Sequence, residues 1–362
     1  MSLLVVVGGQ YGSEGKGKIA AFLSREENID ICVRCGGPNS GHSFINDEGK
    51  TITLRQLPTG FVNGRTRLLL PAGAFIDPLI LKSEIETLSI SPSRIGIDPK
   101  SFVIEERDRQ TESFLRLRER LSSTLSGVGA AVSRRVLRGE DAKLAMDITG
   151  QYPWLAEMIA DVSAEINTAV DRGKKVLIEG TQGFGLSLYH SEHYPHCTGR
   201  DTTASGFLSE VGLSPRSVTD IVVVFRTFPI RVAGAQAGPL REEITWQQIR
   251  AESGYPYEIQ EHTSVTGKVR RVGRFDWDLP DKAVMINRPT RVALNGLDYL
   301  DFANFQRSKW SDMSYEAKRF VRRLEEIVKV PVTMLGTGPS LNDVVLRESE
   351  TASPRLSSAV SG

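Results

Sequence analysis

The feature that most constrains this chain is a glycine-rich loop that directly follows an apolar strand. Residues 3–7 form a continuous run of branched aliphatic side chains, which is typical of a strand buried on both faces. The run enters residues 8–18, a segment with five glycines and two lysines, and an apolar helical pattern follows at residues 19–23. Strand, glycine-rich loop and helix in this order open the nucleotide-binding α/β folds.

The composition of this loop predicts phosphate binding. Glycines let backbone amides approach a ligand closely, lysines add positive charge, and the N-terminus of the following helix attracts an anion. The loop is not a standard P-loop, because five residues separate Gly9 from Gly15 and because Gly17 replaces the usual Ser or Thr. A tight strand-to-helix turn without a ligand is the alternative interpretation.

The rest of the chain predicts one large α/β domain over residues 1–348, with a mainly parallel sheet flanked by helices and a loosely ordered tail at residues 349–362. Apolar runs predict further strands at residues 31–33, 67–70, 175–180, 220–225 and 330–334. Helical spacing predicts helices at residues 105–121 and 155–170 and a helix capped by Ser314.

Composition narrows the class of protein. Lysine and arginine total 45 against 44 acidic residues, so the chain lacks the basic excess of a duplex nucleic-acid binder. Three cysteines suit a reducing compartment. We expect no signal peptide, because the first residues show neither a basic n-region nor a small-residue cleavage pattern, and no transmembrane helix, because no apolar run is long enough. These patterns predict a cytoplasmic protein that binds neither nucleic acid nor membranes.

Several other loops carry groups suited to nucleotide chemistry. His42 ends a glycine-rich loop at residues 36–42 and could act as a general acid or contact phosphate, with a structural role as the alternative. Residues 266–271 combine a glycine with three cations, a pattern that suits an anion or a solvated turn. Strand-end loops at residues 179–183, 295–298 and 336–339 should gather at one edge of a parallel sheet.

Two groups of potential metal ligands are expected to be structural. His190, His193 and His196 are spaced by three, but Pro195 breaks the helix that would align them, so zinc is not expected. Cys32 and Cys35 have no second cysteine pair, and Cys32 falls in a predicted strand.

Taken together, these segments resemble the adenylosuccinate synthetase family along nearly the whole chain. The resemblance implies a P-loop-NTPase-like fold and a ligase that joins aspartate to the 6-position of a purine nucleotide. It implies a nucleoside triphosphate, Mg²⁺ and a 6-phosphoryl intermediate, and a homodimer. The segments that carry the resemblance are residues 8–18, 39–42, 56–60, 123–129, 179–183, 194–204, 266–273, 297–301 and 336–339.

The resemblance also implies roles for individual residues. The catalytic residues would be Ser13, His42 and Gln182, and Mg²⁺ would be lined by Ser13 and Gly41. The monophosphate nucleotide would be held by Ser13, Asn39, Thr124, Gln182, Thr198 and, from the other subunit, Arg138. Aspartate would be held by Thr266, Gly267, Lys268 and Arg270. The donor would be held by Gly12, Ser13, Glu14, Gly15, Lys16, Gly17, Gly41, His42, Ser43, Asn295, Asp298, Gly336, Gly338 and Pro339.

One departure from the family pattern bears on the substrate. The family has an Asp where this chain has Ser13, and that Asp removes the N1 proton of the purine. A serine hydroxyl titrates far above neutral pH and cannot be the same base. Ser13 resembles the phage-type branch, the 2-aminoadenylosuccinate synthetases, which use dGMP. We therefore predict dGMP and L-aspartate as substrates, in a pathway to 2-aminoadenine phage DNA within the host cytoplasm.

Two further departures concern the donor and aspartate. Gly296 stands where the family has a Lys beside its guanine-reading Asp, which favours ATP or dATP over GTP as donor. Lys268 stands where the family usually has Arg, so a point charge replaces a bidentate fork. Two alternatives to a dGMP-using ligase stay open. One is an ordinary adenylosuccinate synthetase acting on IMP with GTP, and the other is a nucleotide-binding protein without catalysis.

Overall fold

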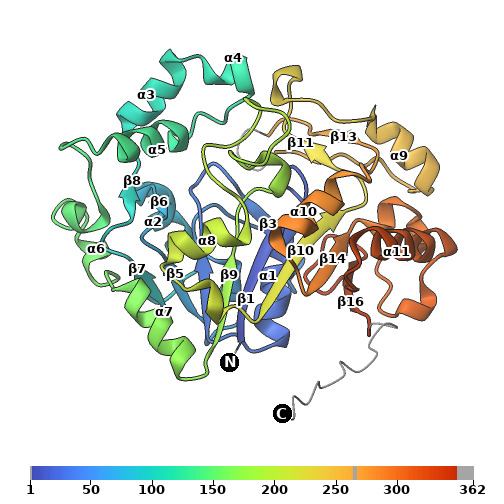
Figure 1. The fold of residues 1–362 in the computed structure, drawn as a ribbon, viewed down its shortest axis with the longest axis horizontal. Helices are drawn as coiled ribbons and strands as arrows, with labels where there is room; N and C mark the ends of the chain where they lie inside the picture. Colours follow the sequence, from blue (N-terminus) through green and yellow to red (C-terminus); the bar gives the residue numbers. More distant parts are fainter. Residues whose placement is uncertain (1, 264–266, 349–362) are drawn as a thin grey trace, which may run out of the picture.

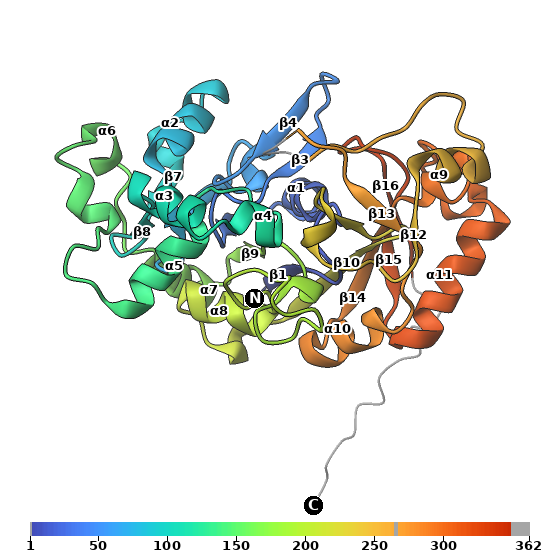
Figure 2. The same ribbon diagram turned by 90° about the horizontal axis from the view of Figure 1, so that it is seen from above.

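The computed structural model describes residues 2–263 and 267–348. Thr266, a candidate aspartate ligand, and the proposed tail at residues 349–362 lie outside the described residues, so the domain boundary at residue 348 stays a prediction. Figures 1 and 2 show a central sheet with helices on both sides and the excursion of α3, α4 and α5 above one half of it.

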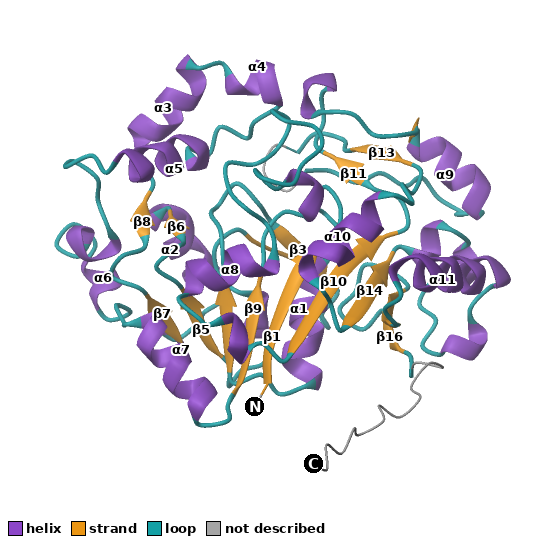
Figure 3. Cartoon of the chain, viewed as in Figure 1, coloured by secondary structure: helices purple, strands orange, loops and turns teal. Residues whose placement is uncertain are grey.

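A nine-stranded sheet forms the centre of the fold, which confirms the predicted α/β class (Figure 3). All neighbouring strands are parallel except β15 and β16, which are antiparallel. From edge to edge the strands are β16 (Val344–Leu346), β15 (Val332–Gly336), β14 (Arg291–Asn295), β10 (Asp220–Arg226), β1 (Ser2–Gly8), β9 (Lys175–Glu179), β2 (Ile31–Arg34), β5 (Arg67–Leu70) and β7 (Ile95–Ile97).

The alternation along β1 shows how the sheet is covered on both faces. Leu3, Val5 and Val7 belong to one apolar cluster, and Leu4 and Val6 belong to a second. The first cluster includes side chains of α7, α8, α10 and α11, and the second includes side chains of α1 and α2. A strand covered on both faces needs a continuous apolar run, and the sequence has one here.

The remaining elements complete these layers. The α-helices are α1 (Lys16–Glu26), α2 (Pro78–Thr87), α3 (Glu106–Phe114), α4 (Leu117–Leu121), α5 (Val128–Leu137), α6 (Pro153–Ala156), α7 (Val162–Asp171), α8 (Ala204–Val211), α9 (Trp246–Ser253), α10 (Leu279–Asn287) and α11 (Tyr315–Val328). Small sheets pair β3 (His42–Ile45) with β4 (Thr51–Leu54), β6 (Phe75–Ile76) with β8 (Phe102–Val103), and β13 (Arg271–Gly273) with both β11 (Ile230–Arg231) and β12 (Glu243–Ile244).

Two predicted helices differ from the structure, whereas the cap of α11 is confirmed. The helix expected at residues 105–121 divides into α3 and α4 at Arg116, whose φ of 53° is left-handed. The helix expected at residues 155–170 begins only at Val162, after the end of α6 at Ala156, and the carboxylate of Asp161 caps this helix, α7, by accepting from the Ala164 amide. Ser314 accepts from the Ala317 amide, as its sequence position predicts.

Candidate active site

The loops predicted to bind nucleotide follow strands that point the same way. The segments after β1, β2, β9, β10, β14 and β15 all leave the carboxyl edge of the sheet, because these strands are parallel (Figure 3). Crevices at this edge are where open α/β sheets bind their ligands.

The glycine-rich loop is organised around a buried carboxylate. Glu14 accepts hydrogen bonds from the backbone amides of Gln10 (3.0 Å) and Gly12 (2.9 Å). Its other oxygen pairs with Lys16 at 2.7 Å, and Lys16 also donates to the carbonyl of Gln182. Both charged side chains are almost fully buried. The predicted donor residues Glu14 and Lys16 therefore hold the shape of the loop.

Ser13 lies at the tip of this loop. Its side chain is exposed and its φ is 60°, in the left-handed region. The carbonyl of Ser13 accepts a hydrogen bond of 2.8 Å from Arg226, the buried last residue of β10. Arg226 thus fixes the backbone of the tip, while residue 13 itself remains exposed to solvent.

His42 belongs to a buried charge cluster that the sequence did not reveal. Its Nδ1 contacts both the Arg34 guanidinium and the Glu179 carboxylate, which pair with each other at 2.6 Å. Glu179 also accepts from the amide (2.7 Å) and hydroxyl (2.9 Å) of Thr59. Within the described residues, His42 Nε2 is buried without a hydrogen-bond partner. The cluster thus orients an imidazole that keeps one nitrogen available.

The charge state of His42 follows from this environment. Burial lowers the pKa of His42 to about 3, and the neighbouring Arg34 contributes to the shift. Burial would raise the pKa of Glu179, but Arg34 and His42 hold it below its usual value. At neutral pH the pair is therefore a carboxylate beside a neutral imidazole. Gly17 permits the close approach of α1, since a Cβ there would lie 2.4 Å from the His42 Cβ.

Segments predicted to hold the monophosphate nucleotide meet beside this cluster. The space around the glycines shows how closely these segments approach one another. A Cβ added at Gly37 would lie 3.0 Å from the Val128 side chain, and one at Gly36 would lie 2.7 Å from that of Thr181. A Cβ added at Gly199 would lie 4.0 Å from Gly129. These approaches bring together the loops that carry Asn39, Thr124, Gln182 and Thr198, which are all partly buried. Gln182 Oε1 is buried without a partner in the described part of the chain.

Arg138 does not join these loops within the chain. It is exposed and follows the last residue of α5, whereas the first residue of α5, Val128, lies against Gly37. A helix of ten residues spans about 15 Å. Arg138 therefore lies well away from the nucleotide loops of this chain.

The predicted donor residues form a second connected group. Asn295 donates to the carbonyl of Glu14 at 2.7 Å, and a Cβ at Gly336 would lie 1.9 Å from Asn295 Oδ1. Lys18 donates to the carbonyl of Gly338 at 2.8 Å.

The β3–β4 hairpin contacts this group of donor residues at the 336–339 loop. The Ile45 amide donates to the carbonyl of Pro339 at 3.2 Å, which joins the hairpin to the 336–339 loop. Ser43 on the hairpin is exposed, and its hydroxyl is 2.8 Å from that of Thr53. Gly41 precedes the hairpin and is partly buried.

Of the candidate aspartate ligands, Arg270 lies closest to the loop network. It pairs with Glu261 at 3.2 Å, and Arg226 pairs with the same carboxylate at 2.6 Å. Burial would raise the pKa of Glu261, but Arg226 and Arg270 hold it at about 2. Gly267, with a φ of 66°, and Lys268 are exposed. A carboxylate thus joins the predicted aspartate-binding arginine to the residue that fixes Ser13.

Sequence reasoning included Glu179 only as the first residue of the 179–183 loop and assigned no role to Arg34, Arg226 and Glu261. A signal for Arg34, Glu179 and Arg226 was present: each is a charged residue that ends its strand directly after a run of at least three apolar residues. Charged side chains are rarely fully buried unless they are paired. Charged residues at these strand ends could therefore have been predicted to pair across the sheet edge.

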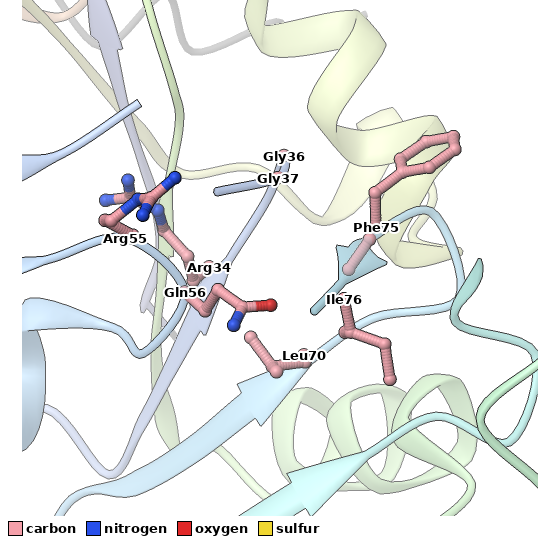
Figure 4. A pocket seen from close by; sticks show the side chains of 9 residues that line it. Arg34, Gly36, Gly37, Arg55, Gln56, Leu70, Phe75 and Ile76 are labelled. Atoms are coloured by element: carbon pink, nitrogen blue, oxygen red, sulfur yellow. The ribbon is translucent and has the colours of Figure 1, made fainter. Parts of the chain in front are cut away.

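Figure 4 shows a small cavity beneath the 36–42 loop. Its volume is about 10 Å³, enough for about one water molecule. It is lined by Arg34, Gly36, Gly37, Arg55, Gln56, Leu70, Ala74, Phe75 and Ile76. Arg55 donates to the carbonyl of Pro38 at 2.7 Å and so supports the loop that carries Asn39. The cavity is lined by the first residues of this loop, Gly36 and Gly37, and is too small for a substrate.

Neither metal clusters nor membrane helices are found in the described part of the chain. Residues 2–263 and 267–348 contain no group of three or more His, Cys, Asp or Glu side chains that could hold a metal ion. Over the same residues, no helix has the length and apolar character needed to span a bilayer.

Known proteins resemble this chain over almost its full length. A family model described as adenylosuccinate synthetase matches residues 5–146 and 139–305. The adenylosuccinate synthetase of Methanocaldococcus jannaschii is 41% identical over 95% of this chain and 96% of its own. That of Thermococcus onnurineus is 42% identical over 96% of this chain and 99% of its own.

Solved structures share the fold. Fully ligated adenylosuccinate synthetase from Plasmodium falciparum matches with a TM-score of 0.84 at 20% identity, over 96% of this chain and 100% of that one. The succinoaminodeoxyadenylate synthetase of cyanophage S-2L, bound to dGMP and to dATP as energy donor, matches with a TM-score of 0.81 at 25% identity, over 95% of each chain.

Glycine-rich and strand-end loops at the carboxyl edge of a parallel sheet define a nucleotide-binding α/β enzyme. Its class is that of the carbon–nitrogen ligases. The chain belongs to the adenylosuccinate synthetase family.

Proposed function

We propose that this ligase joins L-aspartate to the 6-position of dGMP and forms 2-amino-2'-deoxyadenylosuccinate. The γ-phosphoryl group of a triphosphate is transferred to the purine 6-oxygen, and the aspartate amine then displaces phosphate at C6. The observation that carries the proposal is Ser13, an exposed hydroxyl at the position where the family resemblance implies an Asp.

The geometry of the loop supports this choice of substrate. Guanine carries a 2-amino group beside N1–H, so a carboxylate at position 13 would pair with both donors and hold the base too close. A hydroxyl is smaller and accepts one hydrogen bond. Glu14 cannot replace the missing base, because it is buried and already bonded to Lys16 and two backbone amides. Water or the departing phosphate would then accept the N1 proton.

The related proteins support two candidates for the acceptor nucleotide, dGMP and IMP. The cyanophage S-2L enzyme, at 25% identity, was solved with dGMP, which favours the dGMP reading. The archaeal relatives near 40% identity are named adenylosuccinate synthetases, which favours IMP as the alternative. Ser13 supports dGMP, because IMP has no 2-amino group that would require the smaller side chain.

His42 would stabilise the charge that develops between the donor phosphate and the purine 6-oxygen. Nδ1 faces both the donor Arg34 and the acceptor Glu179, so the neutral ring can carry its proton on either nitrogen; in the tautomer in which Arg34 donates to Nδ1, the proton lies on Nε2, the atom without a partner in the described residues. Nε2–H could then donate to the developing negative charge. The Glu179–Arg34 pair keeps the ring in place for this step.

A magnesium ion would be held by few protein atoms. Because the described residues offer no carboxylate cluster, phosphate oxygens and water would supply most ligands, with Ser13 and the Gly41 carbonyl as protein contacts. Mg²⁺ bound there would neutralise the phosphate charge. Arg270 and Lys268 would hold the aspartate carboxylates by charge-assisted hydrogen bonds, together with Gly267 and Thr266.

ATP or dATP is the proposed donor. Gly296 adopts a φ of 82°, and a Cβ there would lie 2.8 Å from the hydroxyl of Thr227. The lysine of the family pattern would therefore be strained at this position. Without that side chain, the recognition of guanine loses a contact, which makes GTP the less favoured donor.

The first prediction concerns the purine. We expect dGMP to support aspartate-dependent phosphate release with a much higher kcat/KM than IMP, because Ser13 leaves room for the 2-amino group. Steady-state assays with dGMP, with IMP and with neither measure this directly. Equal or better use of IMP would contradict the dGMP proposal and leave the ordinary synthetase as the function.

The second prediction concerns a homodimer in which Arg138 contacts the nucleotide of the partner. The exposed position of Arg138, far from its own nucleotide loops, supports this. We expect Arg138→Ala to weaken dGMP binding by ~1.5–3 kcal/mol, the range for a hydrogen bond to a charged group. Equilibrium binding of dGMP measures the loss, and an unchanged thermal unfolding midpoint checks that the fold is intact.

Mixing subunits tests whether Arg138 acts across the interface. A hybrid of Arg138→Ala and Gln182→Ala subunits contains one site with both residues intact, so activity should reappear on mixing. If subunit exchange is demonstrated and no activity returns, Arg138 does not act in trans.

A further inference from the structure

The carboxylate of Asp298 already accepts one hydrogen bond from within the chain. The hydroxyl of Tyr255 donates to Asp298 Oδ2, and both side chains are buried. Burial raises the pKa of Tyr255, and the adjacent Asp298 raises it further, so the hydroxyl keeps its proton. Among the described residues, no other side chain donates a hydrogen bond to Asp298. One of its two oxygens is therefore engaged by Tyr255, while the other has no side-chain donor among the described residues, where only the backbone amide of Asp298 itself donates to the carboxylate besides.

Aromatic neighbours hold Tyr255 in this position. Its ring centroid lies 4.7 Å from that of Phe302, 5.7 Å from that of Tyr299 and 6.2 Å from that of Phe305. Tyr255 is also part of a buried apolar cluster that includes Trp246. Because packed side chains occupy the surrounding space, the Tyr255 hydroxyl cannot readily swing away when a ligand arrives.

Asp298 is connected to the phosphate-binding end of the site. It follows β14, whose last residue, Asn295, donates to the carbonyl of Glu14 at 2.7 Å. Burial raises the pKa of Asp298, while the Tyr255 hydrogen bond and the positive charge of Lys18 oppose that rise. Lys18 in turn donates to the carbonyl of Gly338 at 2.8 Å. Asp298 thus belongs to a segment that contacts the glycine-rich loop through Asn295, and it lies near Lys18, which contacts the 336–339 loop.

The two purine bases make different demands on such a carboxylate. Guanine presents N1–H and the 2-amino group side by side, and this pair of donors is best matched by two free carboxylate oxygens. Adenine presents a 6-amino donor beside N1, which is an acceptor. One free carboxylate oxygen satisfies the 6-amino group of adenine but leaves one donor of guanine without a partner.

We propose that Tyr255 is a specificity-determining residue that favours an adenine donor by occupying one oxygen of Asp298. Tyr255 acts through Asp298 and is therefore a positioning residue. The inference rests on the proposed donor site, and it does not depend on which purine monophosphate is the acceptor.

The test measures donor binding without turnover. Calorimetric titration with the β,γ-imido analogues of ATP and GTP, each with Mg²⁺, gives the ratio of their dissociation constants for the wild type and for Tyr255→Phe. We expect the wild type to prefer the adenine analogue, and Tyr255→Phe to move the ratio toward guanine by ~10-fold or more, as for one hydrogen bond to a charged group. The matched control is Tyr257→Phe, since Tyr257 is 51% exposed and its ring lies 5.4 Å from that of Tyr255.

The ratio of dissociation constants compares two analogues on the same protein, so a general loss of affinity in a variant does not change it. Thermal unfolding shows whether Tyr255→Phe is folded. A second measurement needs no variant. A β,γ-imido ATP analogue without the 6-amino group of adenine should bind the wild type ~10-fold more weakly than the β,γ-imido ATP analogue that carries it. Equal binding of these two would overturn the inference, as would an unchanged ratio in folded Tyr255→Phe.

Failure of the inference is distinguishable from failure of the proposed function. A wild type that prefers the guanine analogue would refute the adenine donor and, with it, the role of Tyr255. An adenine preference that persists in Tyr255→Phe would refute only the role of Tyr255. A failure of dGMP as acceptor would appear in the phosphate-release assay and would leave the titration unaffected.

Discussion

His42→Ala is expected to lower turnover by ~10²-fold or more with little change in nucleotide affinity. The proposed contact from Nε2 strengthens as charge develops between the donor phosphate and the purine 6-oxygen, so its loss raises the barrier without weakening the ground state. Single-turnover rates and equilibrium binding of dGMP measure the two effects separately. The Arg34–Glu179 pair, at 2.6 Å, remains in the variant and should keep the cluster folded.

A histidine outside the proposed site provides the control. His190 is exposed and stacks on Phe184, so His190→Ala should leave turnover close to that of the wild type. If His42→Ala weakened dGMP or donor binding as strongly as it slowed turnover, His42 would be a binding residue, and the proposed transition-state role would be wrong.

Ser13→Asp is expected to shift the purine preference toward IMP. The carboxylate would supply the base of the family pattern for IMP and would crowd the 2-amino group of dGMP. We expect the ratio of kcat/KM for dGMP to that for IMP to fall by ~10-fold or more, the scale of one charged hydrogen bond gained or lost. Steady-state kinetics with both purines in wild type and variant give this ratio.

Ser13→Asn is the matched control for that experiment. Position 13 has a φ of 60°, a conformation that Asn and Asp both tolerate. Asn has nearly the shape of Asp but cannot act as the base, so it should lower activity with dGMP without improving activity with IMP. An unchanged ratio in Ser13→Asp would show that position 13 does not select the purine, and the main support for dGMP would be lost.

Much of the architecture could be predicted because it is encoded locally. The apolar run of β1, the glycines of the loop and the helical pattern of α1 each specify their own conformation through side-chain branching, positive φ or spacing. The same logic failed at residues 105–121, where helical spacing continues through Arg116 but the chain turns. The apolar face expected there is only partly packed within the chain, since Phe114 is 85% exposed whereas Leu117 and Leu121 are partly buried.

The sequence by itself determined the parallel α/β fold, the phosphate-binding character of the first loop and the absence of a carboxylate at position 13. Only the tertiary structure decided what surrounds these groups. Glu179 reaches His42 because β9 pairs with β2, and Tyr255 reaches Asp298 through an aromatic cluster. Such contacts join residues far apart in the chain, so no local pattern encodes them. They arise where packing leaves buried charges that must find partners.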